Sequence, residues 1–221
     1  GMELDDNPLV VPSQGKELSV VYEDDQILAI NKPAEFLSVP GKTILDSVYT
    51  RIVKDYPELT GPIIVHRLDM STSGLMLIAK NKHVHKILQR QFIERTIKKR
   101  YVAILDGGLA EKSGTIDLPL RLDIDDRPRQ LVCYKHGKSA QTNWKVIDQI
   151  DGRTRVHFFP ITGRTHQLRV HAAHSEGLNT SILGDDLYGK RNDRLHLHAE
   201  WIEFMHPMTR KRMELHVEPD F

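Results

Sequence analysis

The sequence contains a single cysteine and no long apolar run. With Cys133 alone, no internal disulfide can form, which fits a reducing compartment such as the cytoplasm. Cys133 lies in an apolar segment, so we expect a buried thiol rather than a nucleophile. No apolar stretch approaches the length of a membrane-spanning helix, and the first residues lack the apolar core of a signal peptide. These absences predict a cytoplasmic protein with no membrane partner.

Charge of one sign is not in excess either, since 31 Lys and Arg residues stand against 30 Asp and Glu residues. A nucleic-acid-binding surface would therefore have to come from local clusters of basic residues. Such clusters occur at residues 95–100, 127–129, 153–169, 190–194 and 210–212. Each one alone is more often a solvated surface than a binding patch. The composition thus permits a basic binding face without requiring one.

Apolar patterning predicts strands and helices interspersed along one domain. Residues 20–22 and 26–31 are typical of a hairpin, which Lys32-Pro33 should end because proline cannot donate to a strand ladder. Helices are predicted at about 46–56, with Asp46 as the N-cap, at 83–95 and at 165–173. Further strands are predicted at 75–79, 101–105, 131–134, around 144–146 and at 155–159.

This order of elements favours an α+β fold with a mixed, largely antiparallel sheet, because most strands are joined by short turns. Residues 1–17 are polar and lack apolar periodicity, so we interpret them as an N-terminal arm. The length suits one compact domain, which we place at residues 18–221.

The nine residues from His66 to Gly74 place one carboxylate, Asp69, in a polar loop directly before an apolar strand. Loops held by rigid strands are where catalytic side chains tend to lie. No second acid is near in the sequence, so the pattern does not indicate a two-carboxylate hydrolase. A carboxylate beside Arg67 is suited to stay ionised and to act as a nucleophile or base. An isolated Arg-x-Asp is more often a structural ion pair, so the wider sequence has to distinguish a catalytic role of Asp69 from a structural one.

The complete string, His-Arg-Leu-Asp-x-x-Thr-Ser-Gly, resembles the signature of the RluA-like pseudouridine synthases. Four more segments match that family in its order, at residues 99–101, 163–171, 184–189 and 197–199. Five motifs in order over most of the chain are a strong signal. The resemblance implies the pseudouridine synthase fold, an α+β structure whose sheet is split by a central active-site cleft. It also implies the compact type without an N-terminal RNA-binding domain of the S4 kind, since few residues precede the first strand.

The resemblance further implies roles for individual residues. Asp69 matches the family's catalytic aspartate, Tyr101 the tyrosine that packs on the target base, and Arg169 the arginine that pairs with the aspartate. Arg67 is expected to fill the space that an extruded base leaves. Phosphate contacts are expected from Lys99, Arg127, Arg129 and Arg164. Propensity alone would make Tyr101 a core residue, and Arg169 could equally be a surface residue of a helix. Whether the aspartate attacks the sugar, attacks the base or removes a ribose proton is left open.

Pseudouridine formation needs no redox change and no metal, and the sequence has neither a glycine-rich phosphate loop nor a recognisable metal-ligand spacing. The twelve histidines invite a metal hypothesis, for example at His166, His171 and His174. His166 and His171 are five residues apart, however, and would not share a helix face. His196 and His198 alternate with leucines, which is typical of strand packing. We therefore predict no cofactor and no metal.

The expected substrate is a stem-loop of large-subunit rRNA, of tRNA or of both, bound by a monomer. A tRNA-only synthase of the same family, an RNA-binding protein without turnover and a metal-dependent hydrolase are the alternatives. The presence of Asp69, Tyr101 and Arg169 argues against a protein that only binds. One segment departs from the family pattern, since residues 177–181 stand where Gly-His-Pro usually precedes Ile182. The conformation of residues 177–182 is therefore left open.

Overall fold

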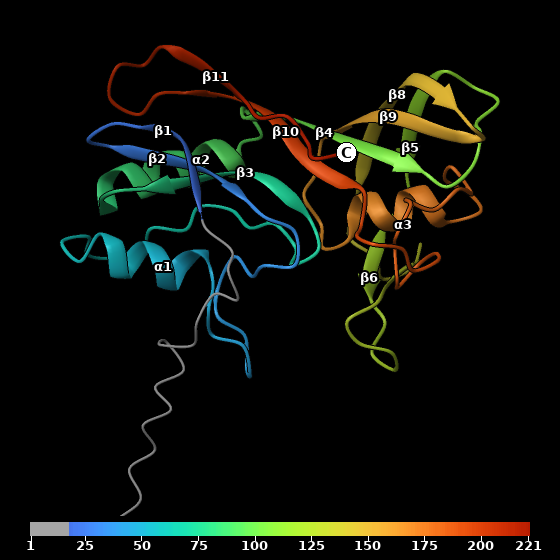
Figure 1. The fold of residues 1–221 in the computed structure, drawn as a ribbon, viewed down its shortest axis with the longest axis horizontal. Coiled ribbons are helices and arrows are strands. Elements are labelled where there is room, and N and C mark those ends of the chain that lie inside the picture. Colours follow the sequence, from blue (N-terminus) through green and yellow to red (C-terminus); the bar gives the residue numbers. More distant parts are fainter. Residues whose placement is uncertain (1–17) are drawn as a thin grey trace, which may run out of the picture. The chain divides into compact units, whose positions relative to one another are not determined.

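The computed structural model describes residues 18–221, so the arm predicted at residues 1–17 lies outside the described residues. Contacts divide the described chain into two compact units, which Figure 1 shows in sequence colours. The first unit holds residues 18–97 and 202–217, and the second holds 98–201 and 218–221. A single catalytic domain over residues 18–221 stays a prediction.

The first unit is an antiparallel arrangement of strands with two helices. Strand β2 lies between β1 and β3 and pairs with both in antiparallel register. The chain returns to this unit at Ile202, within β10, continues through β11, which pairs with β10, and leaves the unit after Val217. The elements are β1 (Ser19–Glu23), β2 (Ile27–Lys32), α1 (Val48–Asp55), β3 (Ser73–Ala79), α2 (Lys82–Ile93), β10 (Leu197–Met205) and β11 (Arg212–His216). The predicted hairpin is present, and β2 ends at Lys32 as expected.

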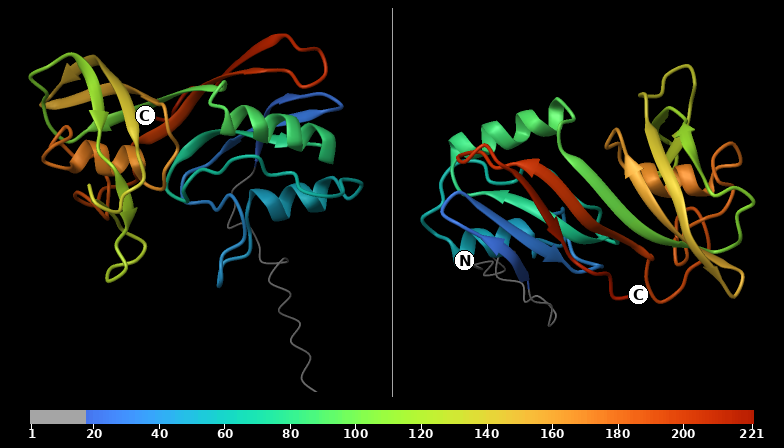
Figure 2. Two further views of the ribbon diagram at one scale, coloured as in Figure 1. Left: turned by 180° about the vertical axis from the view of Figure 1, so that it is seen from behind. Right: turned by 90° about the horizontal axis from the view of Figure 1, so that it is seen from above.

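Strand β3 lies in the core of this unit with both of its faces buried, which explains why it appears in the sequence as a continuous apolar run. All seven residues of β3 are buried, so the strand has no solvent face that would show alternation. Ile27, Ala29 and Leu77 pack in one cluster with Val84 and Leu88 of α2. The residues that alternate with them along β2 and β3 are buried on the opposite face, and α1 lies below these strands in Figures 1 and 2.

Helix α1 begins one residue later than the sequence predicts. Ser47, not Asp46, is the N-cap: its Oγ accepts from the amide of Thr50, and the Thr50 hydroxyl accepts from the amide of Ser47. This reciprocal capping satisfies two backbone donors. Asp46 instead pairs with Arg51 at 3.0 Å. Two neighbouring residues could each cap the helix, and the reciprocal partner at Thr50 decides between them.

The second unit is built around an antiparallel sheet in which β4, β9, β8 and β5 are neighbours in that order. Asp151 and Gly152 join β8 to β9 with positive φ values of 55° and 77°, which an Asp-Gly pair tolerates in a tight hairpin. A separate pair, β6 and β7, forms a short hairpin. The elements are β4 (Lys98–Leu105), β5 (Ser113–Asp117), β6 (Leu120–Leu122), β7 (Gln130–Val132), β8 (Gln141–Ile150), β9 (Arg153–Pro160) and α3 (Gln167–Ala173).

Helix α3 is embedded in the core of the second unit. Its Leu168 and Ala172 pack against Phe158 and Trp144 of the sheet, and Val170 packs under the β6–β7 hairpin beside Leu120. Burial on both sides fixes the direction in which the remaining side chains of the helix point. The α+β prediction, with a mostly antiparallel sheet, is confirmed.

Residues 177–182, whose conformation the sequence left open, close the C-terminal end of α3. The amides of Leu178 and Thr180 donate to the carbonyls of His171 and Ala172 at 3.0 and 2.8 Å. A methyl group on Gly177 would lie 2.0 Å from the His171 carbonyl oxygen, so only glycine fits there. The unusual segment therefore acts as a cap that satisfies carbonyls at the helix end.

Cys133 is half-buried in a turn after β7, which corrects the prediction of a buried thiol. A hydrogen bond from Arg121 lowers the pKa of this thiol. The short strands β5, β6 and β11 were not predicted. β11 does alternate, because Met213 and Leu215 are half-buried between exposed residues, so its signal was present in the sequence and was missed, whereas β5 and β6 carry few large apolar residues. Among residues 18–221, no helix has the length and apolar character needed to cross a membrane.

Candidate active site

The loop that carries Asp69 is fixed by a serine on one side of the aspartate. The Ser38 hydroxyl donates to the carbonyl of Leu68 at 2.6 Å and accepts from the Leu68 amide at 3.1 Å. The Thr72 amide closes a turn on the carbonyl of Asp69 at 3.1 Å. Ser38 is buried, so its two hydrogen bonds to Leu68 are shielded from water. The backbone immediately before Asp69 is therefore held in one conformation.

A buried lysine fixes the other side of the same loop. Lys32 is completely inaccessible to solvent, and its ammonium group donates to the carbonyls of Phe36, Pro33 and Met70 at 2.6, 2.8 and 3.1 Å. The Phe36 amide also donates to the Met70 carbonyl at 3.1 Å. Three carbonyl dipoles offset the cost of burying the cation. Asp69 itself is half-buried, so a rigid backbone presents a carboxylate that a substrate can reach.

The residues flanking Asp69 in the motif have different environments. His66 accepts a hydrogen bond from the Leu77 amide at its Nε2 (2.8 Å), and its ring stacks on Phe92 of α2 at 4.6 Å. His66 therefore anchors the loop to β3 and α2. Arg67 is exposed, so its guanidinium lies at the surface of the first unit beside the aspartate loop. This position suits the predicted insertion into RNA.

Arg169 lies in the second unit, on α3, and forms a buried ion pair. Its side chain is 3% exposed, which rules out a surface position. Its Nε and one terminal nitrogen donate to the two carboxylate oxygens of Asp185 at 3.1 and 2.5 Å, and Asp186 lies at 3.4 Å. The Asp185 carboxylate also accepts from the amides of Leu187 and Tyr188, both at 3.1 Å. The guanidinium is thus fixed by a carboxylate that is itself fixed by backbone amides.

Tyr188 joins this ion pair to the β6–β7 hairpin. Its ring lies under the guanidinium groups of Arg169 and Arg129, at 5.4 and 5.8 Å. Its hydroxyl accepts from the Gln130 amide at 2.8 Å and shares a hydrogen bond of 2.7 Å with Nδ1 of His166. Since the hydroxyl accepts from Gln130, its own hydrogen is available to Nδ1. Burial raises the pKa of Tyr188, which favours this neutral, donating form.

Lys99 and Tyr101 point to one face of β4 because they are two residues apart. Tyr101 is half-buried, pairs across the strands with Phe158, and packs at the margin of the core. Lys99 is also half-buried, and burial lowers the pKa of its ammonium group. A methyl group on Gly163 would lie 3.5 Å from Nζ of Lys99, so this cation reaches the loop that precedes α3.

The three other predicted RNA contacts belong to loops of the second unit. Arg164 donates from Nε to the Ser139 carbonyl at 2.8 Å. Arg127 is exposed in the loop between β6 and β7, while Arg129 pairs with Asp126 at 3.0 Å. Arg129 and Arg169 therefore meet on Tyr188, whereas Asp69 and Arg67 belong to the first unit. The pairing of Asp69 with Arg169 stays a prediction.

Sequence reasoning missed four residues that organise these sites: Lys32, Ser38, Asp185 and Tyr188. A signal existed for two of them, because Asp185 and Tyr188 fall in the 184–189 motif. Lysine and serine, in contrast, are mostly exposed residues in proteins, and no feature of the neighbouring sequence indicates that Lys32 and Ser38 are buried. Within the histidine cluster considered for a metal, both ring nitrogens of His171 already have protein partners, the Thr142 hydroxyl and the Leu118 carbonyl.

Comparison with known proteins identifies the family. Residues 26–174 match the family described as RNA pseudouridylate synthase. The chain is 44% identical over 218 residues to the Dual-specificity RNA pseudouridine synthase RluA of Salmonella typhi, covering 95% of this chain and 97% of that protein. It is 45% identical to the protein of the same name from Yersinia pestis, covering 91% and 99%.

A solved structure, Human RNA Pseudouridylate Synthase Domain Containing 1, matches with a TM-score of 0.78 and 28% identity over 95% of this chain and 86% of that one. The family match covers more than half of the chain, and the relatives match over nearly their whole length. The chain therefore belongs to the RNA pseudouridylate synthase family, of the compact RluA type.

Proposed function

We propose that this chain isomerises specific uridines to pseudouridine in large-subunit rRNA, in tRNA or in both. Membership of the RNA pseudouridylate synthase family supports the reaction, and relatives named dual-specificity enzymes support more than one RNA substrate. The structural observation that carries the proposal is the Asp69 loop, held on both sides by Ser38 and Lys32. A cytoplasmic location belongs to the same proposal, because rRNA and tRNA are found there.

The chemistry is a balanced isomerisation. The bond between N1 of uracil and C1′ of ribose breaks, the base turns, and a bond forms between C5 and C1′. C5 loses a proton and N1 gains one, so nothing is oxidised or reduced. The enzyme therefore has to supply an ionised carboxylate, position the uracil and enclose the site, and protein side chains can do all three. We propose a monomer that works without metal or cofactor.

Asp69 is proposed as the catalytic carboxylate, with Tyr101 packing on the base and Arg169 paired with Asp69. A fixed loop avoids the cost of reorganising the carboxylate during the reaction. Arg169 is positioned independently by Asp185, so its remaining donors have a fixed direction. Arg67 is proposed to enter the base stack when the uridine is extruded, since its planar guanidinium can stack and donate hydrogen bonds at once.

Positioning of the RNA backbone is assigned to the cations of the second unit. Arg127 and Arg129 lie on the β6–β7 loop, and Arg164 and Lys99 flank the loop before α3. Contacts to phosphates set the register of the RNA but carry no sequence information directly. Specificity for a stem-loop would come from its backbone shape and its unstacked bases.

The test is tritium release from rRNA and tRNA transcripts labelled at C5 of uridine. Wild-type protein should release tritium from at least one RNA, and Asp69→Ala should lower the rate by roughly a thousand-fold or more. Asp25→Ala, an exposed acid in the turn between β1 and β2, is the matched control and should keep the wild-type rate. RNA binding without release would favour a non-catalytic binder, and loss of release with a chelator would favour a metal enzyme.

A further inference from the structure

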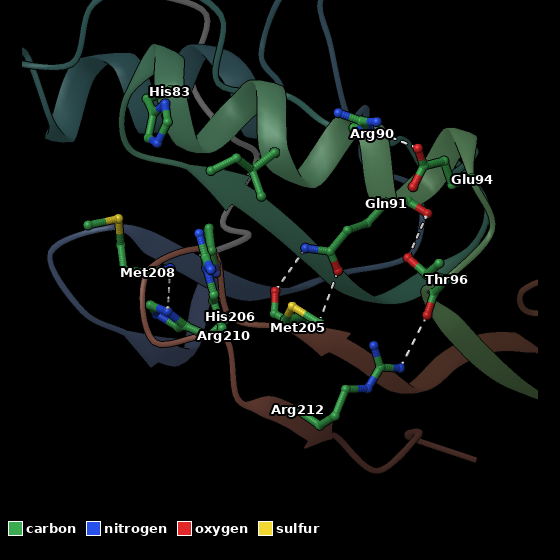
Figure 3. Close-up of a pocket in the computed structure, with 12 residues that line it drawn as sticks. His83, Arg90, Gln91, Glu94, Thr96, Met205, His206, Met208, Arg210 and Arg212 are labelled. Carbon is green, nitrogen blue, oxygen red and sulfur yellow. Dashed lines mark hydrogen bonds and ion pairs between the residues drawn. The ribbon is translucent and has the colours of Figure 1, made fainter.

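A groove in the first unit lies between α2 and the turn that joins β10 to β11, as Figure 3 shows. Its volume is about 680 Å³, within the range of pockets that hold small molecules or single groups of a larger ligand. His83 and Met208 lie at one end of the groove, and Thr96 and Arg212 lie at the other. None of the residues given a catalytic role lines it.

The two walls of the groove are held together by the protein's own contacts. Gln91 of α2 spans the groove floor: its amide nitrogen donates to the Met205 carbonyl at 2.9 Å, and its oxygen accepts from the Met205 amide at 3.0 Å. Arg212 donates to the Thr96 carbonyl at 3.1 Å. The groove is thus formed before any ligand binds, which lowers the entropy cost of binding.

The turn that forms the second wall is also rigid. His206 is buried, accepts at Nδ1 from the amides of Met208 and Thr209, and donates from Nε2 to Asp24 at 2.8 Å. Burial alone would raise the pKa of Asp24, but hydrogen bonds from the Tyr22 hydroxyl, from the backbone amides of Ile27 and Gln26 and from His206 outweigh it and lower this pKa to about 2. The carboxylate therefore stays ionised and keeps the turn in place.

The lining combines apolar surface with positive charge. Met205 and Met208 are 40% and 54% exposed, and Ile87 and Pro207 complete the apolar lining. The lining also holds three arginines and one carboxylate, for a formal charge of +2 with histidines neutral: Arg90, Arg210, Arg212 and Glu94. Glu94 is already paired with Arg90 at 2.8 Å, and Glu203, outside the lining, lies 3.5 Å from Arg212. Each wall carries an arginine, and the excess of positive charge comes from Arg210 and Arg212 on the turn side.

We propose that this groove is a second RNA-binding surface, which holds a single-stranded segment of the substrate other than the target uridine. The proposal rests on the proposed function, because that function makes RNA the natural polyanion for this protein. Phosphates would lie on the arginines of both walls, where counterion release favours binding. Bases would lie on the methionines and on exposed His83, because unstacked bases pack on apolar and imidazole surfaces.

The test uses a fluorescent 12-nucleotide oligoadenylate and the full chain. This probe contains no uridine, so its binding is independent of isomerisation, and failure of the proposed function would show separately in the tritium assay. Arg90→Gln with Arg210→Asn removes one charge from each wall of the groove, and asparagine tolerates the positive φ of 59° at position 210. Met208→Glu places a negative charge on the apolar wall.

Each variant should raise the Kd for oligoadenylate roughly five-fold, and the double variant should reduce the salt slope by about 1.4, two contacts at ~0.7 each. The matched control is Lys42→Gln with Lys54→Gln, two exposed cations elsewhere in the first unit, and should change the Kd less than two-fold. Melting temperatures check that all variants fold.

No binding by wild type, or equal Kd values in variant and control, would overturn the proposal. Groove-dependent binding of a polyglutamate peptide, with oligoadenylate unaffected, would also overturn it in favour of an acidic protein partner.

Discussion

Asp69 in the first unit and Arg169 in the second unit are held in place by different kinds of contact. The Asp69 loop is fixed through its backbone, because Ser38 and Lys32 bind the carbonyls of its neighbours and leave the carboxylate half-buried. Arg169 is fixed through its side chain, by a buried carboxylate and the ring of Tyr188. The Asp69 loop is thus fixed by contacts to its backbone, whereas Arg169 is fixed by an ion pair that partly neutralises its charge.

This difference suits the roles proposed for the two residues. The hydrogen bonds that fix the loop are made to backbone atoms, so these contacts do not use the carboxylate oxygens that a nucleophile or base needs. A group that orients or neutralises can be bound on one side and act from the other, as a guanidinium with five donors can. Breaking one support in each unit should therefore have different consequences for stability and for rate.

The largest effect on stability is expected from Asp185→Asn. The change leaves the Arg169 guanidinium buried at 3% exposure without its carboxylate, and breaking a buried pair in this way costs about 3–5 kcal/mol. Chemical denaturation of both proteins would measure the difference in free energy of unfolding. The double variant Arg169→Met with Asp185→Asn should lose less than Asp185→Asn alone, because no buried guanidinium is left without its carboxylate and the asparagine oxygen can still accept from the amides of Leu187 and Tyr188. An equal or larger loss in the double variant would show that packing, not charge, dominates at this position.

Lys32→Met should have a smaller effect on stability and a clear effect on rate. The substitution keeps an apolar stem but removes the donor to three carbonyls, with an expected cost of roughly 2–3 kcal/mol. The released Met70 carbonyl lies next to Asp69, so tritium release should also fall by about ten- to a hundred-fold. Lys54→Met, at an exposed position on α1, is the control. A stability loss with an unchanged rate would mean that the loop does not depend on this cation.

The sequence predicted those parts of the molecule whose signal is local. Strand β3 and helix α2 carry continuous or periodic apolar residues, and both are present within a few residues of the predicted bounds. The choice between Asp46 and Ser47 as cap failed because both are good caps, and only the reciprocal bond from Thr50 separates them. Strand β9 continues to Pro160, which pairs opposite Thr142, although the sequence placed this proline in a break.

The supports of the candidate site were not predictable because they depend on residues far apart in the chain. Ser38 holds Leu68 across 30 residues, and Lys32 holds Met70 across 38. Neither pairing leaves a periodic trace, and a lysine is among the residues least expected to be buried. Motifs identified which residues matter, while the contacts that fix them became visible only once the chain was folded.

The smallest effect is expected from Tyr188→Phe, which tests whether the hydroxyl links the β6–β7 hairpin to α3. Phenylalanine keeps the ring beside Arg169 but leaves the Gln130 amide and His166 Nδ1 without this partner, for a cost of about 1 kcal/mol. Amide exchange at Gln130 should accelerate by roughly five-fold, since the lost bond shields that hydrogen.

Tyr134→Phe is the matched control: its side chain is 66% exposed and its hydroxyl contacts Glu176 at a longer 3.3 Å. Its stability should change by less than about 0.5 kcal/mol. Equal losses in the two variants would mean that the Tyr188 hydroxyl adds no more than a surface contact, and that Tyr188 contributes its ring and not its hydroxyl beside Arg169.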